Sequence, residues 1–383
     1  MKRLFFALVL AGAFTVLGGA VEAAAPGPFG PLEVGPYLLA PDETSMTVCW
    51  KTAAPSDGKV EYGRTVEYGK SIATPFAAVR QKVTVKGLPS GTEYHYRVVT
   101  PVGATGDFVF RTLPGSDQPM TFVADGDQCG ERFYNRHLAA YADIHPNFVI
   151  STGDIAGAKA EHYDHILGFN RGVWAATPWY PVFGNHDALG DRQGRGAMRE
   201  VFAIPDPPDP ERQEPCLTYY SFDAGGCHFT IRGGTAVHPY GASKAEVAAQ
   251  DKWYQADLAA ARLKSRFVFA LQHDANEKFD YGTTTPAGKF ADILFWGGIH
   301  NYFRGQMGQL TLIQTSGSNS RLREVPNLPW IVTGKKCFDY VCVDVDKDKL
   351  RLRAYDLGDP KVTPKETGGE CIDTYELKSR GAR

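Results

Sequence analysis

Five short apolar runs in this sequence each end beside a side chain that can bind a metal. The runs span residues 121–125, 148–152, 179–183, 267–272 and 293–296. Unbroken runs of β-branched and aromatic residues are typical of strands buried on both faces. The donors that follow them are Asp127, Asp154, Asn185, His273 and His300. Because polar residues at the carboxyl ends of such strands lie where open α/β sheets bind ligands, the pattern predicts one metal site.

Strand and helix patterns alternate from residue 120 onward. Successive donors are separated by roughly thirty residues, the length of a βαβ unit, with one longer insertion between Asn185 and His273. Helices are predicted over 131–144, 162–175 and 245–263. We therefore expect an α/β domain over residues 118–357, followed by a peripheral C-terminal tail over 358–383.

An all-β domain is expected before it, over residues 32–113. Its strand candidates alternate in polarity and are separated by clusters of Gly, Pro and Ser. This spacing is typical of a β-sandwich. Because the segment contains no cluster of titratable groups, we expect it to be structural or to line the rim of a substrate site.

The first 23 residues have the layout of a secretory signal peptide. Lys2 and Arg3 precede an apolar stretch over 4–17, and small residues follow. Cleavage is expected after Ala23 or Ala24, and an uncleaved anchor helix is the alternative. No later run is long enough to span a bilayer. These features predict an exported protein, periplasmic or secreted, without a membrane span in its mature form.

Charge limits the classes of partner. The formal net charge is −2, and loss of the first 23 residues would leave −3. This balance argues against a nucleic acid or an anionic membrane held by bulk electrostatics. The pattern makes no prediction of oligomeric state.

All seven cysteines follow the leader, which is consistent with an oxidising compartment. Cys216 and Cys227 flank a hairpin-like segment and are a reasonable disulfide pair. A second pair is expected among Cys337, Cys342 and Cys371, with its connectivity open.

Taken singly, each donor has a simpler explanation. A Gly-Asp after a strand is commonly turn chemistry, a lone His is commonly a core residue, and Asn-His-Asp can cap a helix. Five such endings in one chain favour a common metal site.

Two carboxylates in one pocket repel each other unless they are protonated or bound to metal. A dinuclear centre removes this conflict, because one carboxylate bridges two ions about 3.5–4 Å apart that clamp the oxygens of an in-line displacement. His186 is the remaining titratable group. It is expected to stabilise the transition state or protonate the leaving oxygen, with Asp187 orienting its ring.

The order of these motifs resembles that of the calcineurin-like metallophosphoesterases. The matching residues are Gly126-Asp127, Gly153-Asp154, Gly184-Asn185-His186-Asp187, His273 and Gly297-Gly-Ile-His300. The preceding segment, with 34–37 and 45–50, is similar to the N-terminal domain of purple acid phosphatases, and 88–94 looks like a fibronectin type III corner.

The resemblance implies a fibronectin III-like sandwich followed by a four-layered α/β/β/α domain. It also implies an acid phosphatase-like phosphomonoesterase, which hydrolyses small phosphate esters with metal-bound hydroxide at a dinuclear centre of iron with iron, zinc or manganese. By the same resemblance, Asp127 and His300 belong to the first metal, Asn185 and His273 to the second, and Asp154 bridges them.

Three positions depart from the family pattern. Purple acid phosphatases have a Tyr where this chain has Gly157, related members have a His where it has Cys129, and the final motif usually has a His where it has Gly298. Replacement ligands are therefore sought among Cys129, Asp125, His162, His165 and Asp274. For Cys129, simple burial or a disulfide is an equal alternative to a soft thiolate ligand.

Other outcomes of these departures stay open. In one, the second metal is the weaker one, with water filling its vacancies; in another, the domain has lost catalysis and serves as a binding or adhesion protein. A phosphodiesterase is a further alternative. By resemblance, Asn301, Tyr302 and Arg304 are expected to shape the substrate pocket, where the planar fork of Arg304 suits a phosphate; a solvated arginine is the simpler reading.

Overall fold

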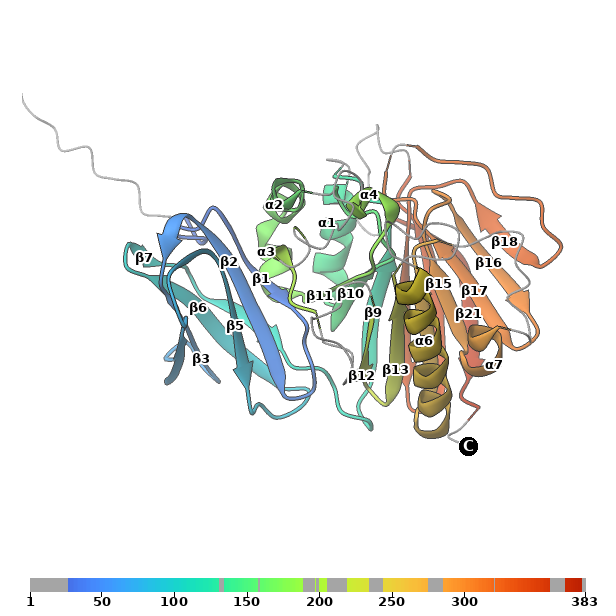
Figure 1. Ribbon diagram of the computed structural model, residues 1–383, viewed down its shortest axis with the longest axis horizontal. Helices are drawn as coiled ribbons and strands as arrows, with labels where there is room; N and C mark the ends of the chain where they lie inside the picture. The colour runs from blue at the N-terminus through green and yellow to red at the C-terminus, as the bar shows by residue number, and fades with distance from the viewer. Residues whose placement is uncertain are drawn as a thin grey trace, which may run out of the picture.

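The computed structural model describes residues 27–130, 134–157, 159–188, 197, 200–204, 219–233, 244–274, 285–319, 321–358 and 369–380. In these ranges, β-sheets and helices are stacked side by side along the long axis of the molecule (Figure 1). The predicted signal peptide lies outside the described residues. None of the described helices is long and apolar enough to cross a membrane.

The N-terminal part is a β-sandwich. Its strands are β1 (Val34–Leu39), β2 (Ser45–Ser56), β3 (Lys59–Gly63), β4 (Lys70–Ala73), β5 (Ala78–Lys86), β6 (Glu93–Thr100), β7 (Gly103–Ala104) and β8 (Phe108–Arg111). Strands β1, β2 and β5 form one face, and β3, β4, β6, β7 and β8 form the other. Alternate side chains point inward, so that Trp50 and Tyr96 are fully buried between the faces. Tyr94, from the predicted corner, is buried there and stacks on Phe110.

The sandwich shares a sheet with the domain that follows. Strands β9 (Met120–Asp125), β10 (Phe148–Ser151) and β11 (Trp179–Pro181) are parallel, and β19 (Asp339–Asp346), β20 (Lys349–Asp356) and β21 (Glu370–Lys378) continue the sheet beyond β9. At the other side, β1 pairs with β11 through Leu39 and Trp179. One nine-stranded sheet therefore crosses the boundary expected between the two domains, in the order β21-β20-β19-β9-β10-β11-β1-β2-β5.

A second central sheet has seven strands. They are β12 (Tyr220–Ala224), β13 (Cys227–Arg232), β14 (Phe267–Gln272), β15 (Ile293–Trp296), β16 (Tyr302–Met307), β17 (Leu310–Thr315) and β18 (Ile331–Lys335), in the order β12-β13-β14-β15-β17-β16-β18. The two sheets pack through a shared aromatic core. Phe122 lies near its centre, with its ring 5.2 Å from Phe229 and 5.3 Å from both Phe148 and Phe269.

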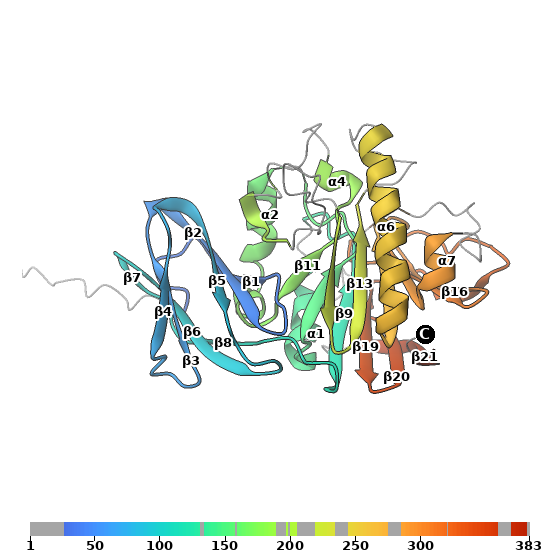
Figure 2. The same cartoon turned by 60° about the horizontal axis from the view of Figure 1, so that its bottom comes forward.

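Helices cover the outer faces of the two sheets (Figure 2). Helices α1 (Asn135–Ile144), α2 (Ala160–Gly168) and α3 (Arg171–Ala176) pack on the first sheet, and α6 (Lys244–Lys264) and α7 (Pro286–Phe290) pack on the second. This confirms the four-layered α/β/β/α arrangement. The helix expected over 162–175 is two helices, because Asn170 adopts a left-handed conformation with φ of 34°.

Two expectations are wrong in the described residues. Residues 370–378 of the expected tail form β21, which pairs with β20 over its whole length. Cys337, Cys342 and Cys371 are all free. Cys342 on β19 and Cys371 on β21 are separated by β20, a distance of about two strand spacings that a disulfide cannot span. Cys227 is also free, whereas Cys216 lies outside the described residues.

Candidate metal centre

The donors lie on the loops that follow parallel strands of the two central sheets. Asp127 follows β9, Asp154 follows β10, and Asn185 begins the short helix α4 (Asn185–Ala188) after β11. His273 follows β14 and His300 follows β15. The carboxyl ends of the parallel strands in both sheets face the same end of the molecule, so the loops that follow these strands meet there (Figure 1).

The loops approach one another too closely for ordinary side chains at some positions. A Cβ atom at Gly184 would lie 2.3 Å from the backbone nitrogen of Asp154, and one at Gly153 would lie 2.6 Å from Nδ1 of His273. Only glycine fits at either position. The glycines of the predicted motifs therefore allow donors from different strands to come into contact.

The Asp154 carboxylate contacts two of the other candidate residues. Its Oδ2 lies 3.3 Å from Nε2 of His273 and 3.8 Å from Nε2 of His186, and its Oδ1 accepts a hydrogen bond of 2.7 Å from the backbone N–H of His186. The amide oxygen of Asn185 lies 3.2 Å from Nε2 of His273. Asp154, Asn185 and His273 thus point their oxygen and nitrogen donors at one another.

Asp127 and His300 form the neighbouring part of the centre. Oδ1 of Asp127 lies 3.2 Å from Nε2 of His300, and Oδ2 accepts a hydrogen bond of 2.8 Å from the backbone N–H of Gly298. Among the described residues, the buried Oδ1 has no donor in hydrogen-bonding geometry. A buried carboxylate oxygen without a donor is unfavourable unless a cation satisfies it.

Both histidine rings are oriented by backbone carbonyl groups. Nδ1 of His273 donates to the carbonyl of Thr152 at 2.8 Å, and Nδ1 of His300 donates to that of Arg321 at 3.1 Å. A carbonyl oxygen only accepts, so Nδ1 holds the proton and the lone pair of the neutral ring is on Nε2. This is the arrangement usual for metal-binding histidines.

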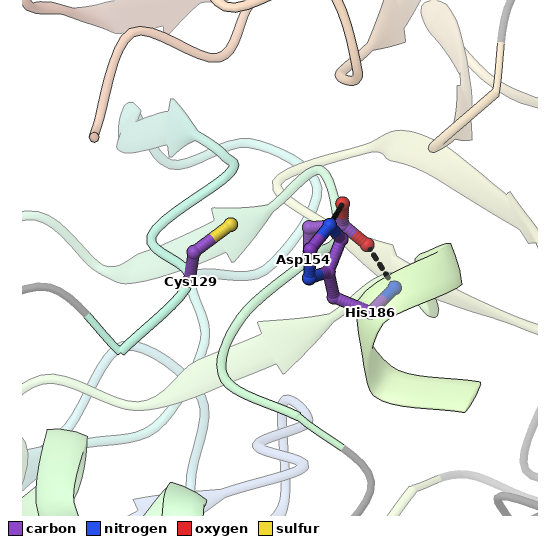
Figure 3. A group of neighbouring side chains, drawn as sticks. All are labelled: Cys129, Asp154 and His186. Atoms are coloured by element: carbon purple, nitrogen blue, oxygen red, sulfur yellow. Dashed lines mark hydrogen bonds and ion pairs between the residues drawn. The ribbon is translucent and has the colours of Figure 1, made fainter. Parts of the chain in front are cut away.

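Cys129, Asp154 and His186 form one group of candidate metal ligands (Figure 3). One ligand atom from each of the three residues lies within 4.8 Å of the others. Asp127, Asp154 and His273 form the other such group, by the same criterion. Asp154 belongs to both groups, so its carboxylate lies between the two sets of donors.

The buried carboxylates of this centre create a negative potential that favours a cation. Burial opposes ionisation of His273, yet the carboxylates of Asp154 and Asp127 raise the pKa of its ring well above 6.5. Burial likewise favours the neutral form of Asp154, but His273 and His186 lower the pKa of its carboxyl. The negative potential that favours a proton on His273 also favours a metal ion, and the mixed carboxylate, amide, imidazole and thiol set suits zinc, iron or manganese.

Asp187 has a role different from the one expected. It does not orient the His186 ring; its buried carboxylate accepts hydrogen bonds from the backbone N–H groups of Ile155, Ala156 and Gly184 at 3.0–3.2 Å, and from the Tyr163 hydroxyl at 3.0 Å. It therefore fixes the loop after β10 to the loop after β11.

Of the expected replacement ligands, only Cys129 belongs to a donor group of the described residues. Asp125 points toward α1, where it accepts hydrogen bonds from Tyr141 and from Gln128. His162 and His165 are exposed side chains of α2, and Asp274 is half-buried outside both groups.

Gly157 and Gly298, two of the positions that depart from the family pattern, have different surroundings. A Cβ at Gly157 would lie 2.4 Å from Nδ1 of His162, so that histidine ring fills the space beside it. A Cβ at Gly298 would meet its nearest neighbour only at 3.6 Å, and the backbone N–H of this glycine already binds Asp127. In the described part of the chain, neither glycine position therefore provides a side-chain donor.

The expected substrate-binding residues have other partners. Asn301 donates to the carbonyl groups of Arg323 and Glu324, and Arg304 forms a two-pronged ion pair with Asp373 at 2.7 and 3.2 Å. The Tyr302 hydroxyl also donates to Asp373. Arg304 and Tyr302 therefore attach β16 to β21 rather than line the metal centre.

Sequence reasoning missed the segment after β17. Asn319 is buried and donates to the carbonyl of Asp127 at 2.6 Å and, weakly, to Sγ of Cys129 at 3.9 Å. Ser316 accepts from the backbone N–H of His300 at 2.7 Å. No short motif marked this segment; its only signal was a run of polar residues after a strand.

Comparisons with known proteins identify a family and similar folds. A family model described as calcineurin-like phosphoesterase matches residues 101–302. No curated protein matches the chain by sequence. A purple acid phosphatase from seeds of yellow lupin (Lupinus luteus) has a TM-score of 0.70 at 16% identity, covering 90% of this chain and 74% of that one.

Two further solved structures are similar. PhoD has a TM-score of 0.71 at 12% identity, covering 93% of this chain and 91% of that one. GAP50, the anchor in the inner membrane complex of Plasmodium, has a TM-score of 0.51 at 13% identity, covering 69% and 90%. At these identities the likeness is one of fold.

Proposed function

Because the chain belongs to the calcineurin-like phosphoesterase family, we propose that it is an exported, metal-dependent hydrolase of small phosphate esters. The observation that carries the proposal is the convergence of Asp127, Asp154 and His273 from three different strand ends, with one ligand atom of each within 4.8 Å of the others. Two ions on either side of one carboxylate are suited to an in-line displacement at phosphorus. Export rests on the N-terminal leader, and mass spectrometry of the mature protein should place its first residue at 24 or 25.

The metal ligands are proposed from the resemblance of the motifs. Asp127 and His300 would hold the first metal, Asn185 and His273 would hold the second, and Asp154 would bridge them. Of the expected replacement ligands, Cys129 is the one that we propose, because its thiol belongs to a donor group of the described residues. When bound, the ions polarise the phosphoryl oxygens and increase the acidity of water in the site.

The residues of the chain supply orientation and a proton. His273 and His300 are fixed by the carbonyl groups that accept from Nδ1, so their Nε2 atoms need no reorientation. The His186 side chain is 36% exposed and lies beside Asp154, where it can reach a substrate. Water attacks phosphorus, the bond to the ester oxygen breaks, and protonated His186 gives its proton to that leaving oxygen.

The experiment is hydrolysis of 4-nitrophenyl phosphate by protein reconstituted with iron, manganese or zinc. Asp154→Ala should abolish turnover and metal binding, because both ions lose their shared ligand. Asp57→Ala, at an exposed position of the sandwich, is the matched control and should leave both unchanged. Full activity of Asp154→Ala would refute the proposal, and faster hydrolysis of bis(4-nitrophenyl) phosphate would redirect it to a phosphodiesterase.

A binding or adhesion protein is the second candidate. The specific observation in its favour is that neither Gly157 nor Gly298 supplies a side-chain ligand. Elemental analysis of protein purified without chelators separates the two functions. A stoichiometric metal content supports the hydrolase, whereas near-zero metal together with no turnover after reconstitution supports the binding protein.

A further inference from the structure

The segment after β17 is attached directly to two of the metal-binding loops. Asn319 donates to the carbonyl of Asp127 and accepts from the backbone N–H of Arg321 at 2.7 Å. The carbonyl of Arg321 accepts from His300 Nδ1, and the N–H of Arg323 donates to the His300 carbonyl at 3.0 Å. The backbone positions of Arg321 and Arg323 beside the centre are therefore fixed.

The two arginine side chains are available for a ligand. Both are exposed, while Leu322 between them is half-buried. Neither guanidinium has an ion pair, a hydrogen bond or a ring partner among the described residues, whereas every other described arginine has at least one. The adjacent acid, Glu324, is paired with Lys336 at 2.8 Å.

Both arginines contact His300 through their backbone, Arg321 by its carbonyl and Arg323 by its N–H. Their exposed side chains extend from these fixed points beside the centre.

We propose that Arg321 and Arg323 bind a second phosphate group of the substrate, next to the phosphate held at the metal centre. The substrate class is then organic bisphosphates, an inference that rests on the proposed hydrolase function. Guanidinium groups match phosphate oxygens through two parallel hydrogen bonds and stay charged at any physiological pH. Without a competing carboxylate partner, they exchange only water for the ligand.

The test compares fructose 1,6-bisphosphate with fructose 6-phosphate, which differ by one phosphate. Release of inorganic phosphate by the reconstituted enzyme gives kcat/KM for each. We expect the bisphosphate to be preferred by about tenfold or more, mainly through KM, because charged hydrogen bonds hold the second phosphate. Arg321→Gln/Arg323→Gln should reduce the preference to the roughly twofold statistical factor of two phosphates per molecule. The matched control is Arg111→Gln, an exposed arginine paired with Glu93 on the sandwich, which should leave the preference unchanged.

Each outcome decides between the two proposals. Equal kcat/KM for the two sugars, or an undiminished preference in the double variant, overturns the role of the arginines while the hydrolase stands. 3-Phosphoglycerate has a carboxylate in place of the second phosphate. If it is preferred over the bisphosphate, the proposed substrate class is overturned. If neither sugar phosphate is hydrolysed although 4-nitrophenyl phosphate is, the bisphosphate class is overturned while the hydrolase stands. If 4-nitrophenyl phosphate is not hydrolysed either, the hydrolase assignment loses its support, and calorimetry tests the arginines alone. Tighter binding of the bisphosphate that the double variant loses supports them, and equal binding refutes them.

Discussion

Cys129 gives the proposed centre a sulfur donor where the family pattern has an imidazole. Its Sγ is grouped with Asp154 and His186, so replacing sulfur by oxygen should weaken binding of a soft metal. We expect Cys129→Ser to lower zinc affinity by about tenfold or more, measured by competition with a chelator. In the cobalt-substituted protein, the thiolate-to-cobalt absorption should disappear in this variant.

The control for that experiment is Cys371→Ser, which removes an exposed thiol outside both donor groups. It should keep both the zinc affinity and the cobalt absorption. A thiolate band that survives in Cys129→Ser would show that another cysteine is the ligand.

His228 predicts a pH dependence of stability away from the metal centre. Burial opposes its protonation, but Asp223 and Asp257 accept from its two ring nitrogens at 2.6 and 2.9 Å and raise its pKa to about 9. The folded pKa lies above the unfolded value of about 6.5, so the stabilisation is complete below pH 6.5 and is lost as pH rises through 9. The loss is on the order of 3 kcal/mol.

Urea unfolding at pH 6 and pH 10 measures this contribution. The wild-type protein should lose more free energy of unfolding between the two values than His228→Gln, which lacks the titrating ring. Equal losses in the two proteins would show that His228 is not the group responsible.

At the scale of elements, one ion-pair cluster joins α2 to the sandwich. Asp164 on α2 lies 2.7 Å from Arg80 of β5 and 3.1 Å from Lys51 of β2. The Arg80 side chain is only 4% exposed, and its other acidic partner, Glu200, lies 3.5 Å away and is 53% exposed, so removing Asp164 leaves a buried charge with only a weak partner. Asp164→Asn should therefore lower the free energy of unfolding by about 3 kcal/mol.

The matched control is Glu93→Gln, which removes an ion pair between two half-exposed side chains of β6 and β8. It should change stability by about 0.5 kcal/mol or less. Similar losses for Asp164→Asn and Glu93→Gln in urea unfolding would mean that burial at this junction contributes nothing.

The elements differ in how far the sequence could predict them. The sequence predicted buried strands such as β10 and β15, because both faces of these strands are covered and their apolar runs are therefore unbroken. Strand β21 was missed because it is an edge strand with only Ile372, Tyr375 and Leu377 turned toward the core. The break at Asn170 was missed because a left-handed residue interrupts a helix without changing its hydrophobic pattern.

The centre shows the same limit for single residues. Donors that follow strands were predicted, since strand order places their loops together. The contacts of Asp187 and Arg304 were not, because a side chain's partner depends on packing between distant segments. Arg321 and Arg323 were missed for this reason too: the hydrogen bonds that bring them to His300 come from a loop without a motif.

At the scale of the whole molecule, the sandwich and the α/β region share both a sheet and a core. Tyr37 and Leu39 of β1 belong to the same buried cluster as Trp174 and Trp179, and the Tyr96 hydroxyl donates to the carbonyl of Ala175. We therefore expect one cooperative unfolding transition for the full chain.

A chain that starts at residue 118 should aggregate. Without β1, the edge of β11 is unpaired and the aromatic surface beneath it is open to solvent. Size-exclusion chromatography of the shortened chain and of one that starts at residue 24 gives the comparison. A monomeric, cooperatively folded short chain would show that the two parts are independent.

Four residues of the proposed centre have left-handed backbone conformations. The φ angles of Asp127, Cys129, Asp154 and His300 lie between 48° and 59°, where a side chain other than glycine costs about 1–2 kcal/mol. Selection for thermal stability alone would therefore favour glycine at these four positions. The metal-binding side chains would then be lost together with the backbone strain. The functional protein is therefore less stable than it could be, and the most stable variants of this chain should be the least active ones.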